Sequence, residues 1–323
     1  MTARRILAIS QTCLDLESLT HWYCQHLGFR KLTSQRLQGS WVKDLFGCED
    51  HMIIDRALLE LGEEQLQLWQ WQSKSATQQA DPVSRAMPAD SRSNDRWFQH
   101  ICMVTNNLSS VYTDDLRKSS EAISTAIQTL PNWNAAAAGI QAVKLKDPLG
   151  HPLELLQFPD DKGNQRWHGL ATDLGRPLGI DHTAIGISNT RNSVVFYRDL
   201  LGLVVGGTSH NHGKEQDGLD GLSEIQVEIT SFRPTGQPLG IELLNYLQPE
   251  GGRERSNPRP TDINEWRIII DCENLDELHA VMKGSELVNS CGPVVDVQQE
   301  FCGRPRGFVV RDPDQHALVL VGE

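Results

Sequence analysis

The fold can be predicted from one apolar segment, Gly179-Ile-Asp-His-Thr-Ala-Ile-Gly-Ile-Ser188. Its length and apolar character are typical of a short buried strand, and His182 lies near its start. Phe98-Gln-His-Ile-Cys-Met-Val-Thr105 has the same form, with His100 in the corresponding place. Two such strands in one chain indicate an internal repeat in which each copy carries one histidine.

Each of these strands is followed, a helix and two or three strands later, by an apolar strand that contains one glutamate. These later strands are Gly240-Ile-Glu-Leu-Leu-Asn-Tyr246, with Glu242, and His151-Pro-Leu-Glu-Leu-Leu-Gln-Phe158, with Glu154. A carboxylate in an apolar strand is costly to bury unless a cation meets it. Two histidines and two glutamates in matching places of two repeats indicate that this cation is a metal ion.

Further alignments extend the repeat over the whole chain. Residues 14–29 and 188–203 align without gaps and predict matching helices, each with an N-cap residue and a final glycine. Residues 146–155 align with 311–320, and the Asp-Pro turn in each predicts a hairpin that leads into a final strand. The chain is therefore predicted as four units of one strand, one helix and three strands, at 5–72, 96–158, 179–248 and 264–322.

This pattern predicts an α+β protein with two halves. Residues 1–158 form the predicted N-terminal half, 159–178 a linker, and 179–323 the C-terminal half. The polar stretch 73–95 and the Gly-rich stretch 206–221 are predicted as exposed loops, with the length of lids.

Composition restricts the partners and the compartment. The net charge of 30 − 42 = −12 argues against nucleic acid and anionic membranes as main partners, and no apolar run approaches the length of a membrane span. The seven cysteines are odd in number and include no Cys-x-x-Cys pair, which favours free thiols in a reducing cytosol. We expect a cytoplasmic protein with a small-molecule substrate, either a monomer or a homodimer.

The four βαβββ units, the helix end Phe196-Tyr-Arg-Asp-Leu-Leu-Gly202 and the hairpin Asp147-Pro-Leu-Gly-His-Pro-Leu-Glu-Leu155 resemble the vicinal-oxygen-chelate superfamily. That superfamily includes glyoxalase I, ring-cleaving dioxygenases and drug-resistance proteins. The resemblance implies two half-barrel clefts, each closed by two units. It also implies that metal ligands come from the first and last strands of each unit, so the chain has eight candidate positions.

Units two and three place His100, Glu154, His182 and Glu242 in these positions. Units one and four place there Ala8, Gln67, Arg267 and Val319. If units pair in chain order, each cleft has an incomplete ligand set. If units two and three pair with each other, one complete site and one vestigial site result, and we favour this crosswise pairing because it explains all eight positions.

Two imidazoles and two carboxylates suit one divalent transition metal: Zn, Ni, Co, Mn or Fe(II). Resemblance to glyoxalase I implies an isomerase, epimerase or lyase in which the metal stabilises an enediolate and Glu154 or Glu242 acts as general base. The first alternative is an Fe(II) dioxygenase that opens an aromatic ring, and the second is a metal-free binding protein. Tyr246 shares a strand face with Glu242 and is a predicted substrate contact. Arg233, in the segment before Glu242, meets either an anionic substrate group or solvent.

Overall fold

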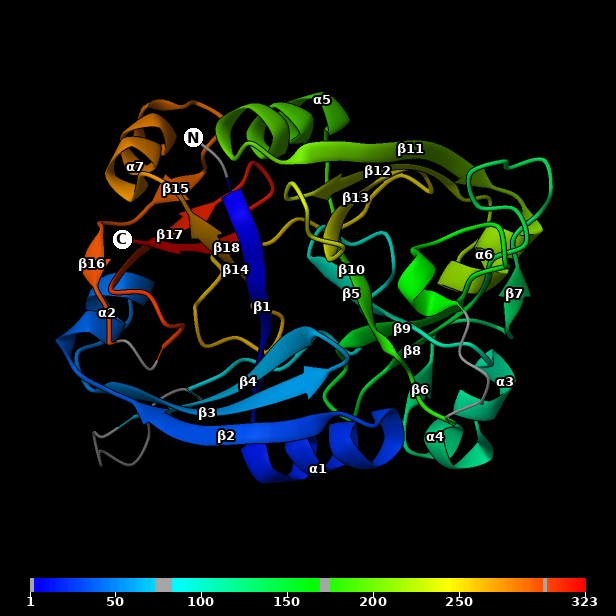
Figure 1. Ribbon diagram of the computed structural model, residues 1–323, viewed down its shortest axis with the longest axis horizontal. Coiled ribbons are helices and arrows are strands. Elements are labelled where there is room, and N and C mark those ends of the chain that lie inside the picture. Colours follow the sequence, from blue (N-terminus) through cyan, green and yellow to red (C-terminus); the bar gives the residue numbers. More distant parts are fainter. Residues whose placement is uncertain (1–2, 74–82, 169–174, 299–300) are drawn as a thin grey trace.

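The computed structural model describes residues 3–73, 83–168, 175–298 and 301–323. Within these residues the strands form two nine-stranded sheets, which lie side by side in Figure 1. Sheet A contains β1 (Ala3–Cys13), β2 (Arg30–Leu37), β3 (Met52–Leu61), β4 (Glu64–Ser73), β14 (Trp266–Cys272), β15 (Ser290–Cys291), β16 (Val295–Asp296), β17 (Arg306–Arg311) and β18 (Ala317–Gly322). Sheet B contains β5 (Phe98–Val104), β6 (Glu121–Ala122), β7 (Gln128–Thr129), β8 (Gln141–Lys146), β9 (Pro152–Gln157), β10 (Gly179–Gly186), β11 (Val204–His212), β12 (Gln226–Arg233) and β13 (Gly240–Gln248).

The units pair crosswise. Sheet A joins the first unit to the fourth through antiparallel pairing of β1 with β14, so blue and orange-red strands share one sheet in Figure 1. Sheet B joins the second unit to the third through antiparallel pairing of β5 with β10. The predicted α+β class with two half-barrel clefts is confirmed. The division of the chain into halves at residues 158 and 179 stays a prediction, since each sheet takes one unit from either half.

Seven α-helices accompany the sheets within the described residues, and none is long and apolar enough to span a membrane. They are α1 (Leu16–Leu27), α2 (Ser40–Phe46), α3 (Leu108–Val111), α4 (Asp114–Lys118), α5 (Thr190–Val194), α6 (Lys214–Asp220) and α7 (Leu275–Gly284). The predicted matching helices are α1 and α5, and α5 continues with wider π-helical turns over Val195–Leu200.

The ends of the two matching helices follow from single residues. Asp15 and Asn189 accept hydrogen bonds from backbone N–H groups three residues later, which satisfies donors that a helix start leaves free. Gly28 and Gly202 have φ angles of 69° and 75°, a left-handed conformation that glycine adopts without steric cost. The sequence predicted these four positions correctly.

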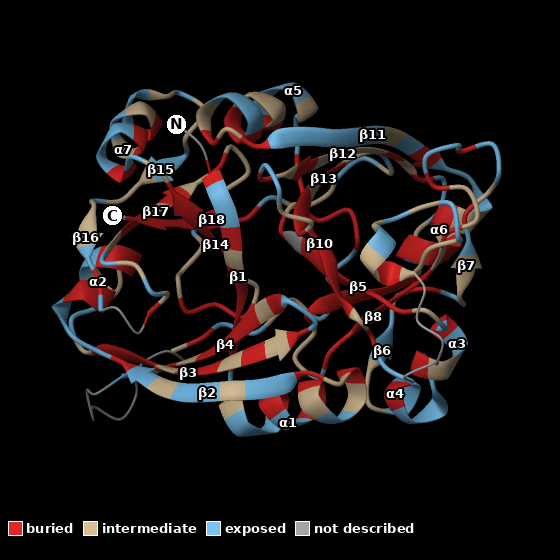
Figure 2. Ribbon diagram, in the orientation of Figure 1, coloured by how far each residue is buried: buried red, intermediate tan, exposed pale blue. Residues whose placement is uncertain are grey.

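The prediction of an exposed loop at 206–221 is wrong. Residues Val204–His212 form β11, the outermost strand of sheet B, and Lys214–Asp220 form α6. Polar residues and glycines suggested a loop, but an edge strand has one open side and tolerates them; Figure 2 shows β11 largely exposed. Of the other predicted loop, 73–95, residues 74–82 lie outside the described part of the chain.

The concave face of sheet A is filled by side chains. A buried cluster there contains Trp41, Phe46, Trp69, Trp71 and Phe301, whose rings contact one another at centroid distances from 5.3 to 6.3 Å. Aromatic side chains of this size bury large apolar areas and stabilise the sheet. The cleft that sheet A would otherwise enclose is therefore part of the hydrophobic core.

The four vestigial positions lie in or beside this cluster. Ala8 and Val319 belong to it, and Gln67 accepts a hydrogen bond from Trp69 Nε1 at 3.0 Å. The Arg267 guanidinium lies 4.7 Å from the ring centroid of Trp69, in cation–π contact. Arg267 thus occupies a ligand position with a positive charge, which excludes a metal cation there.

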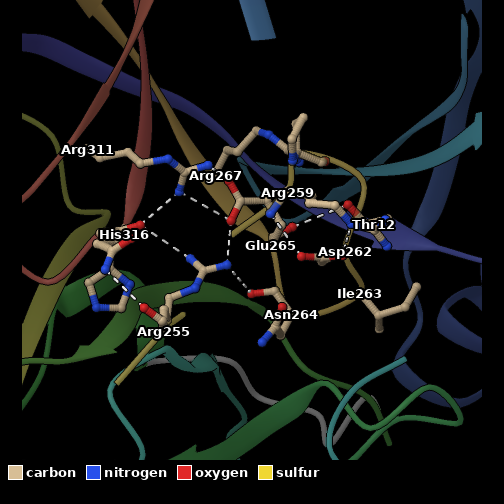
Figure 3. Close-up of polar contacts among 12 residues, drawn as sticks. Thr12, Arg255, Arg259, Asp262, Ile263, Asn264, Glu265, Arg267, Arg311 and His316 are labelled. Atoms are coloured by element: carbon tan, nitrogen blue, oxygen red, sulfur yellow. Dashed lines mark hydrogen bonds and ion pairs between the residues drawn. The ribbon is translucent and has the colours of Figure 1, made fainter. Parts of the chain in front are cut away.

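A buried ion-pair network compensates for arginine charge in sheet A. Figure 3 shows Arg255 and Arg311 converging on the carboxylate of Glu265, which is fully buried. The Arg311 Nη2 atom lies 2.6 Å from Glu265 Oε1. Burial alone would raise the pKa of Glu265, but the surrounding guanidinium charges of Arg255, Arg311 and Arg267 lower it. One carboxylate therefore balances several buried cations.

We predict that Glu265→Gln lowers the free energy of unfolding by about 3–5 kcal/mol, because it leaves buried guanidinium groups without their counter-charge. Urea unfolding followed by circular dichroism measures this. Glu254→Gln is the matched control, since the Glu254 side chain is 77% exposed in its ion pair with Arg96 and solvent screens that pair. Equal losses in the two variants would contradict the role of Glu265.

Candidate metal centre

Four neighbouring strands in the middle of sheet B carry the predicted ligands. The strand order is β13, β10, β5, β9, and these strands carry Glu242, His182, His100 and Glu154 respectively. The register relates the two halves of the site. Cys102 lies beside both His182 and Glu154, and Ala184 lies beside both His100 and Glu242. These small side chains leave space between the ligand pairs, as the sequence suggested.

Three of the four residues form a close group. His100 Nε2 lies 2.8 Å from Glu154 Oε2, and His182 Nε2 lies 3.9 Å from the same oxygen. One candidate ligand atom from each of these residues lies within 4.8 Å of the other two. Glu242 is next to this group rather than part of it, with Oε2 3.4 Å from His182 Nε2.

Each histidine is held by the residue before it. The β5–β10 pairing has two bulges, in which Gln99 and Asp181 are extra residues without a partner in the register. A regular strand would turn these side chains to the opposite face from the histidines. Here Asp181 Oδ2 lies 3.1 Å from His182 Nδ1, and Gln99 Oε1 bonds His100 Nδ1.

The remaining ring nitrogens fit a metal ion. The Nε2 atoms of His100 and His182 are buried and contact carboxylate oxygens as ion pairs, at 2.8 Å from Glu154 and 3.4 Å from Glu242 respectively. Neither Nε2 atom makes a contact with hydrogen-bond geometry to any residue in the described part of the chain, which is rare for a buried polar atom. Both Nε2 atoms face carboxylate oxygens, and both Nδ1 atoms already have acceptors, which is the usual arrangement of histidine ligands to a metal. This donor set fits one divalent transition metal.

Burial and nearby charges shift the pKa values at the centre. Burial lowers the pKa of His100 to about 4. Burial opposes ionisation of Glu154, but the neighbouring His100 and Lys144 bring its pKa down to about 2. A neutral imidazole and an ionised carboxylate are the forms that bind metals.

The other pair shows the effect of excess negative charge. Burial alone would lower the pKa of His182, but Glu242, Asp181 and Glu154 raise it to about 9. Burial raises the pKa of Glu242, and the neighbouring carboxylates add to this. Three carboxylates around one imidazole form a site that a dication would balance.

The centre lies at the floor of a cleft of about 570 Å³. Both predicted substrate contacts, Arg233 and Tyr246, line this cleft. Neither is free: Arg233 Nη2 lies 3.2 Å from Asp181 Oδ2, and the Tyr246 hydroxyl bonds Asp220 and Gln99. The rest of the wall is mixed: its apolar part includes Leu130, Ile140, Leu156, Leu219, Val227 and Leu244, and its polar part includes Thr208, Ser209, Asn211 and Gln216.

Sequence reasoning missed the residues that support the ligands: Gln99, Asp181, Lys144 and Asp220. A signal for the first two was present, because a polar residue precedes the histidine in both otherwise apolar strands. Lys144 lies within the apolar strand β8, where it pairs with Glu154 of the neighbouring strand β9. No sequence pattern connects Lys144 to Asp220, which lies 76 residues away on α6.

No family model and no curated protein matches the sequence significantly. Among solved structures, glyoxalase I from Zea mays superposes with a TM-score of 0.57 at 13% identity, covering 98% of this chain and 92% of that one. A putative dioxygenase from Bacillus subtilis subsp. subtilis str. 168 superposes with a TM-score of 0.58 at 12% identity, covering 99% and 86%. At these identities the similarity concerns the fold. The chain therefore shares the fold of these two proteins over nearly its whole length, and this is the fold that its sequence predicts.

Proposed function

We propose that the protein is a metal-dependent enzyme that moves a proton at a carbon next to an oxygen-bearing carbon of a small substrate, as an isomerase, epimerase or lyase. The observation that carries this proposal is the arrangement of four residues. His100, Glu154 and His182 converge on one point, and Glu242 lies beside them with its carboxylate outside the group. Such an arrangement supplies a metal site and a separate base in one cleft.

In this proposal His100, Glu154 and His182 hold one divalent ion, with Glu242 within reach of it. When bound, the ion would act as a Lewis acid that polarises two neighbouring substrate oxygens and offsets the negative charge that develops as the proton leaves. Glu242 accepts that proton on a carboxylate oxygen and returns it to the substrate. Its side chain is 24% exposed and that of Glu154 is 7% exposed, which supports Glu242 over Glu154 as the base that meets substrate.

The supporting residues orient these groups. Asp181 holds the ring of His182 through Nδ1, and Arg233 in turn holds Asp181. The apolar part of the cleft wall accommodates the apolar part of a small oxygenated substrate.

An Fe(II) dioxygenase is the second candidate, and the same three-residue group favours it. Two histidines and one carboxylate with the remaining positions open are typical of non-haem iron oxygenases. In that case Glu242 would not be a ligand, which agrees with its place outside the group. The two candidates differ in the reaction: the first removes a proton from the substrate, whereas the dioxygenase consumes O₂.

We predict that the purified protein contains about one divalent transition metal per chain and that His100→Ala and His182→Ala each lose it, because each removes one of the ligands. Elemental analysis of untagged protein measures this. His210→Ala is the control, since His210 is exposed on β11 and outside the ligand group. Retention of the metal in either ligand variant would exclude a shared centre, and a wild type that binds no metal would favour the metal-free binding protein.

We further predict that Glu242→Gln retains the metal but slows proton exchange by about 10²–10⁴-fold, the usual contribution of a general base. Proton NMR in D₂O, with α-hydroxyketones and hemithioacetals of methylglyoxal as probes, measures the exchange of the substrate proton. Ser231→Ala, which alters another residue of the cleft wall, is the control. Oxygen uptake by the Fe(II) form with catechols or hydroquinones, without any proton exchange, would overturn the isomerase proposal in favour of the dioxygenase.

A further inference from the structure

Asp220, the last residue of α6, is a fully buried carboxylate that receives hydrogen bonds from three sides. Lys144 Nζ donates to Oδ1 at 2.5 Å. Gln216 Nε2 and the Tyr246 hydroxyl donate to Oδ2 at 2.8 and 2.9 Å. An ionised carboxylate only accepts hydrogen bonds, so each of these partners has to be a donor toward it. Lys144, also buried, places its ammonium group against this carboxylate as an ion pair.

The Tyr246 branch leads from Asp220 to the metal centre. Because the Tyr246 hydroxyl gives its proton to Asp220, its oxygen accepts the next bond, from Gln99 Nε2 at 3.2 Å. Gln99 Nε2 also donates to the backbone carbonyl of Ser93 at 3.2 Å. With its nitrogen so engaged, the Gln99 amide presents Oε1 to His100 Nδ1. An amide oxygen only accepts, so His100 Nδ1 carries the proton.

A second branch runs in the same sense and ends at the same carboxylate. Asn134 Nδ2 donates to Asn211 Oδ1 at 2.7 Å, and Asn211 Nδ2 donates to Gln216 Oε1 at 3.1 Å. Gln216 then donates to Asp220. Asn134, Asn211 and Gln216 are all buried. Apart from the bond from Gln99 Nε2 to the Ser93 carbonyl, the donors of both branches point toward Asp220, which therefore sets the direction of the two branches.

We propose that Asp220 is a positioning residue that acts on His100 through Tyr246 and Gln99. It holds the imidazole in the form protonated on Nδ1, so that the Nε2 lone pair faces the centre. The inference rests on the proposed function in that Nε2 is taken as a metal ligand. It assigns Tyr246 to ligand support as a link in this relay, where the sequence suggested a substrate contact.

His182, the other candidate ligand, needs no relay of this kind. Asp181 is itself a carboxylate and accepts directly from His182 Nδ1. Gln99, in the matching bulge position, is an amide with one donating and one accepting end, and either end can face a ring nitrogen. Two acceptors on the nitrogen side fix the direction of Gln99: the Ser93 carbonyl, and the Tyr246 hydroxyl oxygen, which is turned toward Gln99 by its own bond to Asp220.

The test follows the protonation site of His100 in metal-free protein. Protein with ¹⁵N-labelled histidine is studied by long-range ¹H–¹⁵N NMR of the imidazole nitrogens at pH 7, and His100→Gln assigns the signal. In metal-free protein Glu154 Oε2, 2.8 Å from Nε2, competes for the ring proton, so we expect His100 in wild type to be a mixture of the Nδ1–H and Nε2–H forms. Asp220→Asn and Tyr246→Phe should shift this mixture toward the Nε2–H form.

The control is Tyr197→Phe. Its hydroxyl also donates to a buried carboxylate, Asp312, at the same distance of 2.9 Å, but it lies outside the cleft. It should leave the His100 signal unchanged. Zinc affinity, measured by competition with a chelator, should fall about tenfold in Asp220→Asn and Tyr246→Phe, at the lower end of the range for residues behind a ligand, and stay unchanged in the control.

The outcomes separate the relay from the function. If His100 keeps the wild-type proportion of the two forms in Tyr246→Phe and in folded Asp220→Asn, the relay is wrong. If Asp220→Asn does not fold because Lys144 loses its counter-charge, Tyr246→Phe alone decides. If the variants shift the protonation site but wild type binds no zinc, cobalt, nickel, manganese or Fe(II), the relay stands and the proposed function fails.

Discussion

The antiparallel pairing of β5 with β10, with one bulge in each strand, is the constraint on which the rest of the site depends. Without the bulges, the alternation of a strand would turn Gln99 and Asp181 away from the histidines that follow them. With them, each histidine has an acceptor on Nδ1 and presents Nε2 to the same point. The flanking strands then bring the Glu154 carboxylate of β9 to that point and the Glu242 carboxylate of β13 beside it.

A comparison of the two sheets shows that strand pairing with a bulge does not by itself create a metal site. The pairing of β1 with β14 in sheet A also has a bulge, at Leu7, just before the ligand position Ala8. The backbone there repeats the arrangement before His100 and His182, but the side chains differ. Arg267 brings a positive charge, Trp69 and its aromatic neighbours fill the concave face, and Glu265 balances the buried arginines. The same fold therefore carries a candidate metal centre in sheet B and a packed core in sheet A.

The sequence predicted the repeat, the fold and the crosswise pairing because these depend on patterns that recur at fixed spacing. His100 and His182 lie the same number of residues before a helix N-cap, and this spacing can be counted in the sequence without knowledge of the fold. Bulges have no recurring spacing in the sequence, so the contacts of Gln99 and Asp181 with the histidine rings were not predicted. The link from Lys144 to Asp220 joins elements of different units, which no local pattern records. Stretch 206–221 was misassigned because polar composition is shared by loops and edge strands. The roles of the six predicted site residues stay predictions.

The crosswise pairing also has a consequence for the order in which the chain assembles. Sheet B uses only residues between Phe98 and Gln248, whereas sheet A needs strands from both ends of the chain. As the ribosome releases the chain from its N-terminus, the strands of the first unit emerge first. Sheet A stays incomplete until β14 and β18 have also emerged. During that interval β1 has a partner in β4 on one side and an open edge on the other. All strands of sheet B have therefore been released before sheet A has all of its strands. Until β14 is available, the open edge of β1 can pair with another strand.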